Sequence, residues 1–192
     1  MSVKSIMIVG VGGQGTLLAS KLLGNALLTK GYDVKISEVH GMSQRGGSVV
    51  TYVKYGTSVA SPIIEKGEAD IILSFEQLEA ARWLPYLKKD GKIIVNTQCI
   101  DPMPVIIGAV KYPEGILEKI DEAGARIMPV DALKLAMEAG SAKAVNVSLI
   151  GVMAKHTDIE KDVWLQTIKD TVPEKFLEIN LKAFELGYNS NT

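Results

Sequence analysis

The first 38 residues carry the pattern that constrains the fold most: an apolar run, a glycine-rich turn and an amphipathic segment in direct succession. Val3–Val9 is short, apolar and β-branched, as is typical of a buried strand. The turn Gly10–Gly15 reads Gly-Val-Gly-Gly-Gln-Gly, and apolar residues recur at helical spacing through Thr16–Lys30. Gly31 is suited to end that helix, and Tyr32–Glu38 resembles a second strand. The segment therefore predicts a Rossmann-like first βαβ unit.

Strand-like and helix-like segments go on alternating along the rest of the chain. This alternation predicts an α/β fold, a three-layer sandwich with a mostly parallel sheet between helices. We expect one domain over residues 1–187 and a frayed tail at 188–192. Further strands are expected at Val49–Tyr55, Ile71–Ser74, Lys92–Asn96 and Arg126–Val130, and helices at Phe75–Leu87, Glu114–Ala123, Ala132–Ala139, Val145–Ala154, Trp164–Lys169 and Glu174–Leu186. Asp90-Gly91 predicts a turn, and the proline-containing segment Asp101–Pro104 interrupts the alternation before an apolar run at Val105–Val110.

The charge balance gives no indication of a function that depends on clustered positive charge. The chain has 21 basic and 22 acidic residues, a formal net charge of -1, so we expect it to bind neither nucleic acid nor anionic lipid. No uncharged apolar stretch approaches the roughly 18 residues of a membrane span, and the N-terminus does not resemble a signal peptide. We expect a cytoplasmic protein that works on small molecules or on other proteins.

Cys99 is the single cysteine of the sequence. One thiol cannot form a disulfide within the chain, and a cysteine-ligated zinc or iron–sulfur site needs several. A catalytic thiol would need a neighbouring base and a lowered pKa, and nothing near Cys99 in sequence supplies either. We therefore expect this chain to hold no metal of its own.

The glycine turn can be interpreted in two ways, as a nucleotide-binding loop or as a packing element. Gly10, Gly12 and Gly15 match the dinucleotide fingerprint G-x-G-x-x-G between a strand and a helix, and the helix N-terminus that follows favours an anion. Glu38 ends the second strand, where a ribose-binding acid would lie. Alternatively, the glycines only allow close packing of the helix on the sheet. Two features count against NAD binding in particular. Glu38 is followed directly by another polar loop, and the sequence shows no obvious second half with substrate-handling residues.

That second loop, His40–Ser48, is the most informative stretch. It reads His-Gly-Met-Ser-Gln-Arg-Gly-Gly-Ser and follows the expected end of a strand, where ligand crevices of open α/β sheets lie. Arg45 could bind a carboxylate or phosphate with two parallel hydrogen bonds, and His40 could donate, accept or titrate near neutral pH. The alternative is a surface loop with a solvated arginine. The candidate residues for a substrate or cofactor cleft are Gly10, Gly12, Gly13, Gln14, Gly15, His40, Ser43, Gln44, Arg45, Gly46 and Gly47.

The two loops together resemble a known family. Gly10–Gly15 and His40–Ser48 are similar to the corresponding loops in the small subunit of 2-oxoacid:ferredoxin oxidoreductases, the gamma-type subunit, and specifically in the indolepyruvate branch. The pyruvate branch tends to carry an arginine-rich second loop instead. The likeness extends over most of the chain, through Ser61-Pro62, Gly67–Asp70, Phe75-Glu76, Asn96 and Asn146.

The resemblance implies a reaction that this chain cannot perform alone. A 2-oxoacid such as indolepyruvate is oxidatively decarboxylated to an acyl-CoA, with electrons passing to ferredoxin. In the family, thiamine diphosphate, magnesium and the iron–sulfur clusters belong to a large (alpha) subunit, and coenzyme A is a cosubstrate. The small chain would complete the cleft of that partner. Two other functions stay open: an independent NAD-dependent oxidoreductase, and a non-catalytic nucleotide- or anion-binding module that regulates a partner.

Several other residues carry weaker expectations. Asn146 is placed to cap the helix that begins there, and His156, at the end of the same helix, is placed to complement the helix dipole as a cation. Phe75 is expected in the core, and Trp83 and Trp164 in the core or an interface. Glu76 could line the crevice at a strand end.

Overall fold

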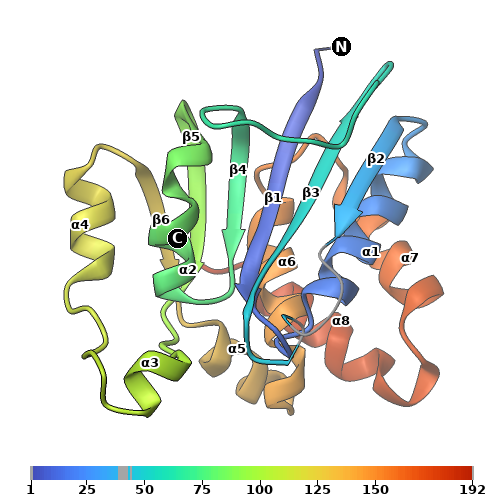
Figure 1. The fold of residues 1–192 in the computed structure, drawn as a ribbon. Coiled ribbons are helices and arrows are strands. Elements are labelled where there is room, and N and C mark those ends of the chain that lie inside the picture. Colours follow the sequence, from blue (N-terminus) through green and yellow to red (C-terminus); the bar gives the residue numbers. More distant parts are fainter. Residues whose placement is uncertain (1, 39–42, 44, 192) are drawn as a thin grey trace.

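The structure is a computed structural model that describes residues 2–38, 43 and 45–191. In this part of the chain six strands form one sheet in the order β2-β3-β1-β4-β5-β6 (Figure 1). The strands are β1 (Lys4–Val11), β2 (Asp33–Glu38), β3 (Ser48–Gly56), β4 (Ala69–Ser74), β5 (Leu87–Asn96) and β6 (Arg126–Val130). All except β3 point in the same direction, so their carboxyl ends share one edge, the lower edge in Figure 1. The predicted α/β class and mostly parallel sheet are confirmed.

Helices cover both faces of the sheet (Figure 1). They are α1 (Thr16–Thr29), α2 (Gln77–Trp83), α3 (Met103–Ile106), α4 (Ile116–Glu122), α5 (Ala132–Ala139), α6 (Val145–Ala154), α7 (Lys161–Thr171) and α8 (Glu174–Tyr188), with 3-10 turns η2 (Leu84–Tyr86) and η3 (Ala142–Ala144). Helices α1 and α5–α8 contribute to the core on one face, and α2 and α4 to the core on the other. No helix in the described residues is long and apolar enough to cross a membrane.

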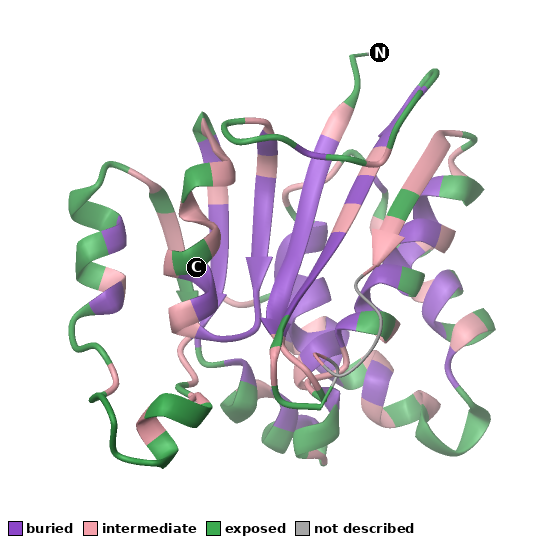
Figure 2. Ribbon diagram, in the orientation of Figure 1, coloured by how far each residue is buried: buried purple, intermediate pink, exposed green. Residues whose placement is uncertain are grey.

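The period-2 alternation of the strands divides the core between the two faces. In β1, Ile6 and Ile8 join the cluster under α1 and α6, whereas Met7 and Val9 join the cluster under α2 and α4. All four side chains are buried, and most of β1 has the colour of buried residues in Figure 2. Because both faces are covered, the strand reads as a continuous apolar run, which is why it could be recognised from the sequence.

The first βαβ unit differs from a Rossmann unit in one respect. Strand β3 lies between β1 and β2 and runs antiparallel to both. Strand β2 therefore keeps the expected direction but does not neighbour β1. Local sequence could not reveal this insertion, because it depends on which distant strands pair.

Several element boundaries depart from expectation. The predicted turn at Asp90-Gly91 lies inside β5, where the β4–β5 register shifts and Gly91 packs closely against Leu87. The expected helix from Phe75 begins at Gln77 and tightens into the 3-10 turn η2 at Pro85. Helix α8 continues to Tyr188, one residue into the expected tail.

Candidate functional site: the glycine-loop edge of the sheet

The glycine turn lies at the shared carboxyl edge of the strands, between β1 and α1. Gly13 and Gly15 have φ values of 103° and 84°, in the left-handed region that favours glycine. Gly15 is the N-cap of α1, and its carbonyl oxygen accepts a hydrogen bond from Asn146 Nδ2 at 3.2 Å. This hydrogen bond links α6 to the glycine turn. The N-cap of α6 is Ala144, whereas the sequence predicts Asn146.

Gln14 has a structural role in this turn. Its Oε1 accepts a hydrogen bond from the Val11 amide at 2.7 Å, and its Nε2 donates to the Phe75 carbonyl at 2.9 Å. A Cβ on Gly10 would lie 2.9 Å from both Gln14 Oε1 and the Phe75 side chain. Gly10 and Gln14 therefore serve the packing of the turn against the end of β4, and Phe75 is a core residue as expected.

The two sequence motifs meet at this edge. The Gly12 amide donates to the Gly47 carbonyl at 2.9 Å, and the Gly47 amide donates to the Ser43 carbonyl at 3.0 Å. Gly46 has a φ of 89°, and Arg45 is exposed to solvent. The predicted candidates His40 and Gln44 lie outside the described residues. The insertion of β3 next to β1 is what brings the second motif beside the first.

The first turn of α1 leaves backbone donors available. No side chain in the described part of the chain caps the N-terminus at Gly15, and the first turn contains no acidic residue. The first N–H groups of a helix lack intrahelical partners and lie at the positive end of its dipole. This arrangement favours a carboxylate or phosphate near Gly13 and Gly15.

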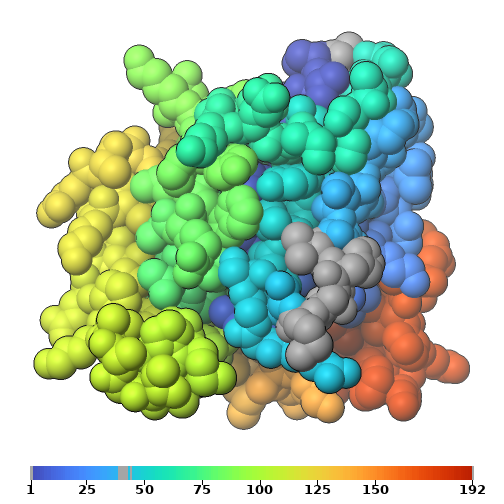
Figure 3. Space-filling model, viewed as in Figure 1, coloured from blue at the N-terminus to red at the C-terminus, as the bar shows by residue number. Residues whose placement is uncertain are grey.

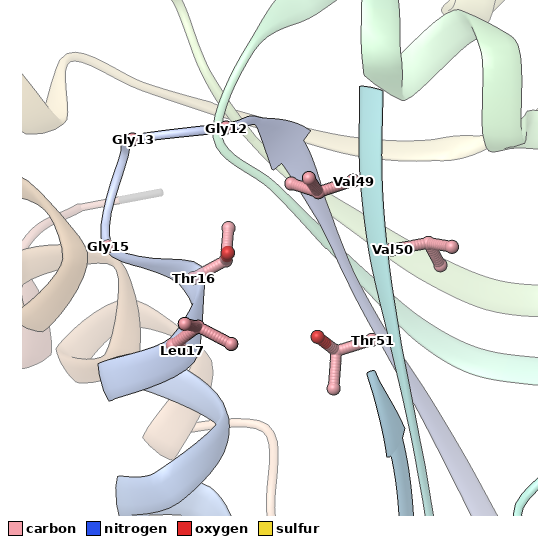
Figure 4. A pocket seen from close by; sticks show the side chains of 8 residues that line it. All are labelled: Gly12, Gly13, Gly15, Thr16, Leu17, Val49, Val50 and Thr51. Atoms are coloured by element: carbon pink, nitrogen blue, oxygen red, sulfur yellow. The ribbon is translucent and has the colours of Figure 1, made fainter. Parts of the chain in front are cut away.

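Two cavities flank the glycine turn. The first, about 280 Å³, lies between α1 and β3 and is lined by Gly12, Gly13, Gly15, Thr16, Leu17, Val49, Val50 and Thr51. The side chains of Thr16 and Thr51 face each other across it, and Val49 lies on the same side of β3 (Figure 4). Its wall combines hydroxyl groups with apolar surface, which suits a small ligand with both characters.

The second cavity, about 510 Å³, opens on the other side of the turn. It is lined by Gly13, Gln14, Gly15, Gln98, Leu133, Ala142, Lys143 and Val145. Sequence reasoning missed Gln98, although its position just after β5 was a usable signal. Lys143 gave no signal, because it lies in a short connection before α6 that only the fold brings to this edge. Its ammonium group adds positive charge to a cavity that already borders the α1 N-terminus.

Two acidic residues predicted near the crevice have structural partners instead. Glu76 is buried, and its carboxylate accepts hydrogen bonds from the Glu79 amide at 2.9 Å, the Ile100 amide at 3.2 Å and the Tyr112 hydroxyl. Burial and this carboxylate raise the pKa of Tyr112. Glu38 accepts a hydrogen bond from Ser20 on α1. Because β3 separates β2 from β1, Glu38 does not take the position of a ribose-binding acid beside the glycine turn.

A charged pocket of about 180 Å³ lies at the opposite, amino edge of the sheet. Here Lys92 Nζ lies 3.2 Å from His156 Nδ1. Burial lowers the pKa of His156, and the positive charges of Lys92, Lys155 and Arg126 lower it further. These neighbours favour the neutral ring over the cation that this helix end could accommodate. The pocket is separate from the glycine-loop edge.

Comparison with known proteins identifies the family. The family model for pyruvate ferredoxin/flavodoxin oxidoreductase matches residues 5–190. The chain is 45% identical over 188 residues to indolepyruvate oxidoreductase subunit IorB of Thermococcus kodakarensis, covering 95% of this chain and 93% of that protein. It is 44% identical over 190 residues to the IorB subunit of Pyrococcus horikoshii, with the same two shares of 95% and 93%. A solved structure, the pyruvate oxidoreductase subunit PORC of Thermotoga maritima, shares the fold with a TM-score of 0.74 at 21% identity, covering 98% of this chain and 96% of that one.

These matches span nearly the whole chain, and the resemblance drawn from the two glycine-rich motifs is confirmed. The chain belongs to the pyruvate ferredoxin/flavodoxin oxidoreductase family, as a small subunit of the gamma type.

Proposed function

We propose that this chain is the small subunit of an indolepyruvate ferredoxin oxidoreductase and that its glycine-loop edge completes the active-site cleft of a large subunit. The reaction is the oxidative decarboxylation of an aryl 2-oxoacid to an acyl-CoA, with the electrons passing to ferredoxin. The observation that carries the proposal is the Gly12–Gly47 hydrogen bond, which joins the two family motifs at the edge where α1 presents unpaired donors.

The cofactors are assigned to the partner. The single thiol of Cys99 cannot supply the ligands of an iron–sulfur cluster. In this proposal thiamine diphosphate, with magnesium, is held by the large subunit and supplies the stabilisation of the carbanion formed on decarboxylation. Coenzyme A is the second substrate.

The residues of this chain bind and orient the substrates. The amides near Gly13 and Gly15 and the ammonium of Lys143 form a positively polarised surface for the carboxylate of the oxoacid or the phosphates of coenzyme A. Arg45, exposed on the second loop, adds a guanidinium that can pair with either group through two hydrogen bonds. The apolar side chains of Val49 and Leu133 reduce the access of water to the two cavities.

Reconstitution tests the proposal. Reduction of ferredoxin or a viologen by indolepyruvate and coenzyme A is measured with this chain, with the large subunit and with both. We expect activity only from the mixture. Full activity from the large subunit alone would make this chain a regulator or a bystander, and activity from this chain alone would overturn the assignment of the cofactors.

Arg45 gives the next experiment. In the reconstituted enzyme Arg45→Ala is expected to lower kcat/KM by about tenfold or more, because a charge-assisted contact contributes roughly 1.5–3 kcal/mol. Lys89→Ala, which removes an exposed cation at the amino edge, serves as the matched control and should leave kcat/KM unchanged. If kcat/KM is the same for both variants and the wild type, Arg45 does not contact a substrate.

A further inference from the structure

The larger cavity beside the glycine turn is lined by two glutamines that differ in how their amides are used. Both ends of the Gln14 amide are occupied, by the Val11 amide and the Phe75 carbonyl. Gln98 accepts a hydrogen bond at its Oε1 from Asn96 Nδ2, at 3.3 Å. Its Nε2 has no acceptor within the part of the chain that the structure describes. The amino group of Gln98 is therefore a side-chain donor that remains available to a ligand.

The orientation of the Gln98 amide is set by Asn96, the last residue of β5. Asn96 is fully buried, and both ends of its side chain meet backbone groups. Its Oδ1 accepts a hydrogen bond from the Ala132 amide at 3.2 Å, and its Nδ2 donates to the Phe75 carbonyl at 3.1 Å. An amide nitrogen cannot accept the first bond and an oxygen cannot donate the second, so only one orientation of Asn96 satisfies both. The remaining hydrogen on Nδ2 then selects the oxygen of Gln98 and leaves the Gln98 nitrogen free.

The backbone that carries Gln98 is also held in place by neighbouring elements. The Thr97 amide donates to the Val130 carbonyl at 2.9 Å, and the Thr97 carbonyl accepts from Gln77 Nε2 at 2.6 Å. The Gln98 carbonyl accepts from the Gln77 amide at 3.2 Å. This segment leads from β5 to α3, and α3 and α5 both lie at the lower edge of the molecule (Figures 1 and 3). A donor on a backbone held in this way loses less conformational entropy when it binds than a donor on a free loop.

The groups around Gln98 favour an anionic ligand. Lys143 lines the same cavity, and no aspartate or glutamate does. The amides of Gly13 and Gly15, which also line it, have no hydrogen-bond acceptor in the described residues. All of these donors can pair with a carboxylate or phosphate oxygen, whereas no side chain of the lining offers a negative charge to a cation.

We propose that Gln98 contacts the anionic group of a substrate, a carboxylate or a phosphate, and that Asn96 is the positioning residue for this contact. This inference rests on the proposed function, in which the two possible groups are the carboxylate of the 2-oxoacid and the phosphates of coenzyme A. Both groups present acceptor oxygens, which match the amino group of Gln98. A reversed Gln98 amide would present an oxygen and repel them. Asn96 thus contributes to specificity without touching the substrate.

Steady-state kinetics of the reconstituted enzyme test the role of Gln98. Indolepyruvate is varied at saturating coenzyme A, and coenzyme A at saturating indolepyruvate. We expect Gln98→Ala to raise the KM of one of the two substrates about tenfold at unchanged kcat, because a hydrogen bond to a charged group is stronger than a neutral one. The substrate that is affected identifies the group as the carboxylate or a phosphate. Gln98→Glu, which places a carboxylate in the same position, should raise the same KM further.

The matched control is Gln166→Glu, the same substitution at an exposed residue of α7, and it should change neither KM. Unchanged KM values for both substrates in both Gln98 variants, with an active wild-type complex, would overturn the inference and leave the proposed function intact. An inactive wild-type complex would overturn the proposed function itself.

A double variant separates positioning by Asn96 from a purely structural role. If Asn96 acts through Gln98, Asn96→Ala raises the KM in the wild-type background but does not raise it further in the Gln98→Ala background. Effects of the two substitutions that multiply would overturn the positioning role. Melting temperatures are measured for every variant, because Asn96 is buried and its loss also lowers stability. Gln98 is only partly buried, so its variants decide the contact even where Asn96→Ala does not fold.

Discussion

Helices α6 and α8 cross so closely that two glycines contact the backbone of the opposing helix. A Cβ on Gly187 would overlap the carbonyl oxygen of Ser148 and lie 2.9 Å from its carbonyl carbon. A Cβ on Gly151 would likewise overlap the Phe184 carbonyl oxygen and lie 2.9 Å from the Tyr188 amide nitrogen. The core on this face of the sheet therefore depends on the absence of two side chains.

We predict that Gly187→Ala lowers the free energy of unfolding by about 2 kcal/mol. Overpacking costs about 1–3 kcal/mol, and the upper end applies here because the opposing atoms are backbone and cannot rotate away. The greater helix propensity of alanine returns up to about 1 kcal/mol. In a domain of this size each kcal/mol shifts the melting temperature by about 2–4 °C, so the expected decrease is roughly 4–8 °C.

Calorimetric unfolding of the wild type and variant at one pH measures this decrease. Gly24→Ala in α1 is the matched control, because a Cβ there would meet only the Ile36 Cδ1 atom, at 2.7 Å, and that methyl group can move. Its melting temperature should equal or exceed that of the wild type. The reasoning is refuted if Gly187→Ala melts no lower than the wild type, or if Gly24→Ala loses as much.

Three further predictions concern the turn, the amino edge and the cleft. Gln14→Ala removes two hydrogen bonds at the glycine turn and should cost about 2–3 kcal/mol, measured by urea unfolding; an unchanged midpoint would contradict the structural role of Gln14. The lowered pKa of His156 means that the unfolded chain binds a proton where the folded chain does not, so stability falls as the pH falls through the usual histidine range. His156→Gln should reduce this pH dependence of stability, measured as melting temperature against pH. Equal slopes for the wild type and the variant would contradict the prediction. Lys143→Ala should raise the KM for coenzyme A about tenfold without changing the melting temperature; a parallel loss of stability would indicate a structural role instead.

The elements of this fold could be predicted wherever local periodicity determines them. Strand β6 and helices α5 and α6 lie where the apolar pattern placed them. The order of strands could not be predicted, because the antiparallel insertion of β3 depends on long-range pairing. The turn expected at Asp90-Gly91 failed for a related reason, since Gly91 allows close packing inside β5 instead of reversing the chain.

The location of the two glycine motifs could be predicted more readily than the role of each residue. Both motifs follow strand ends in the sequence, and the structure places both at the carboxyl edge of the sheet. Gln14 looked like a ligand-binding residue, but its partner Phe75 is 61 positions away in sequence. Lys143 reaches the same edge only through the packing of α6, which no local pattern encodes. The assignments of His40 and Gln44 stay predictions.

The insertion of β3 also has a consequence for the order in which the protein folds. The residues paired between β1 and β3 are 37 to 51 positions apart in the sequence, so this contact forms only after a long loop has closed. The two glycine motifs cannot meet before that event, and a nascent chain that ends ahead of β3 carries half of the cleft without its counterpart. Once formed, however, β3 is hydrogen-bonded on both sides, by β1 and by β2, and is protected from the fraying of an edge strand. The pairing of β3 is thus slow to form and, once formed, resistant to fraying.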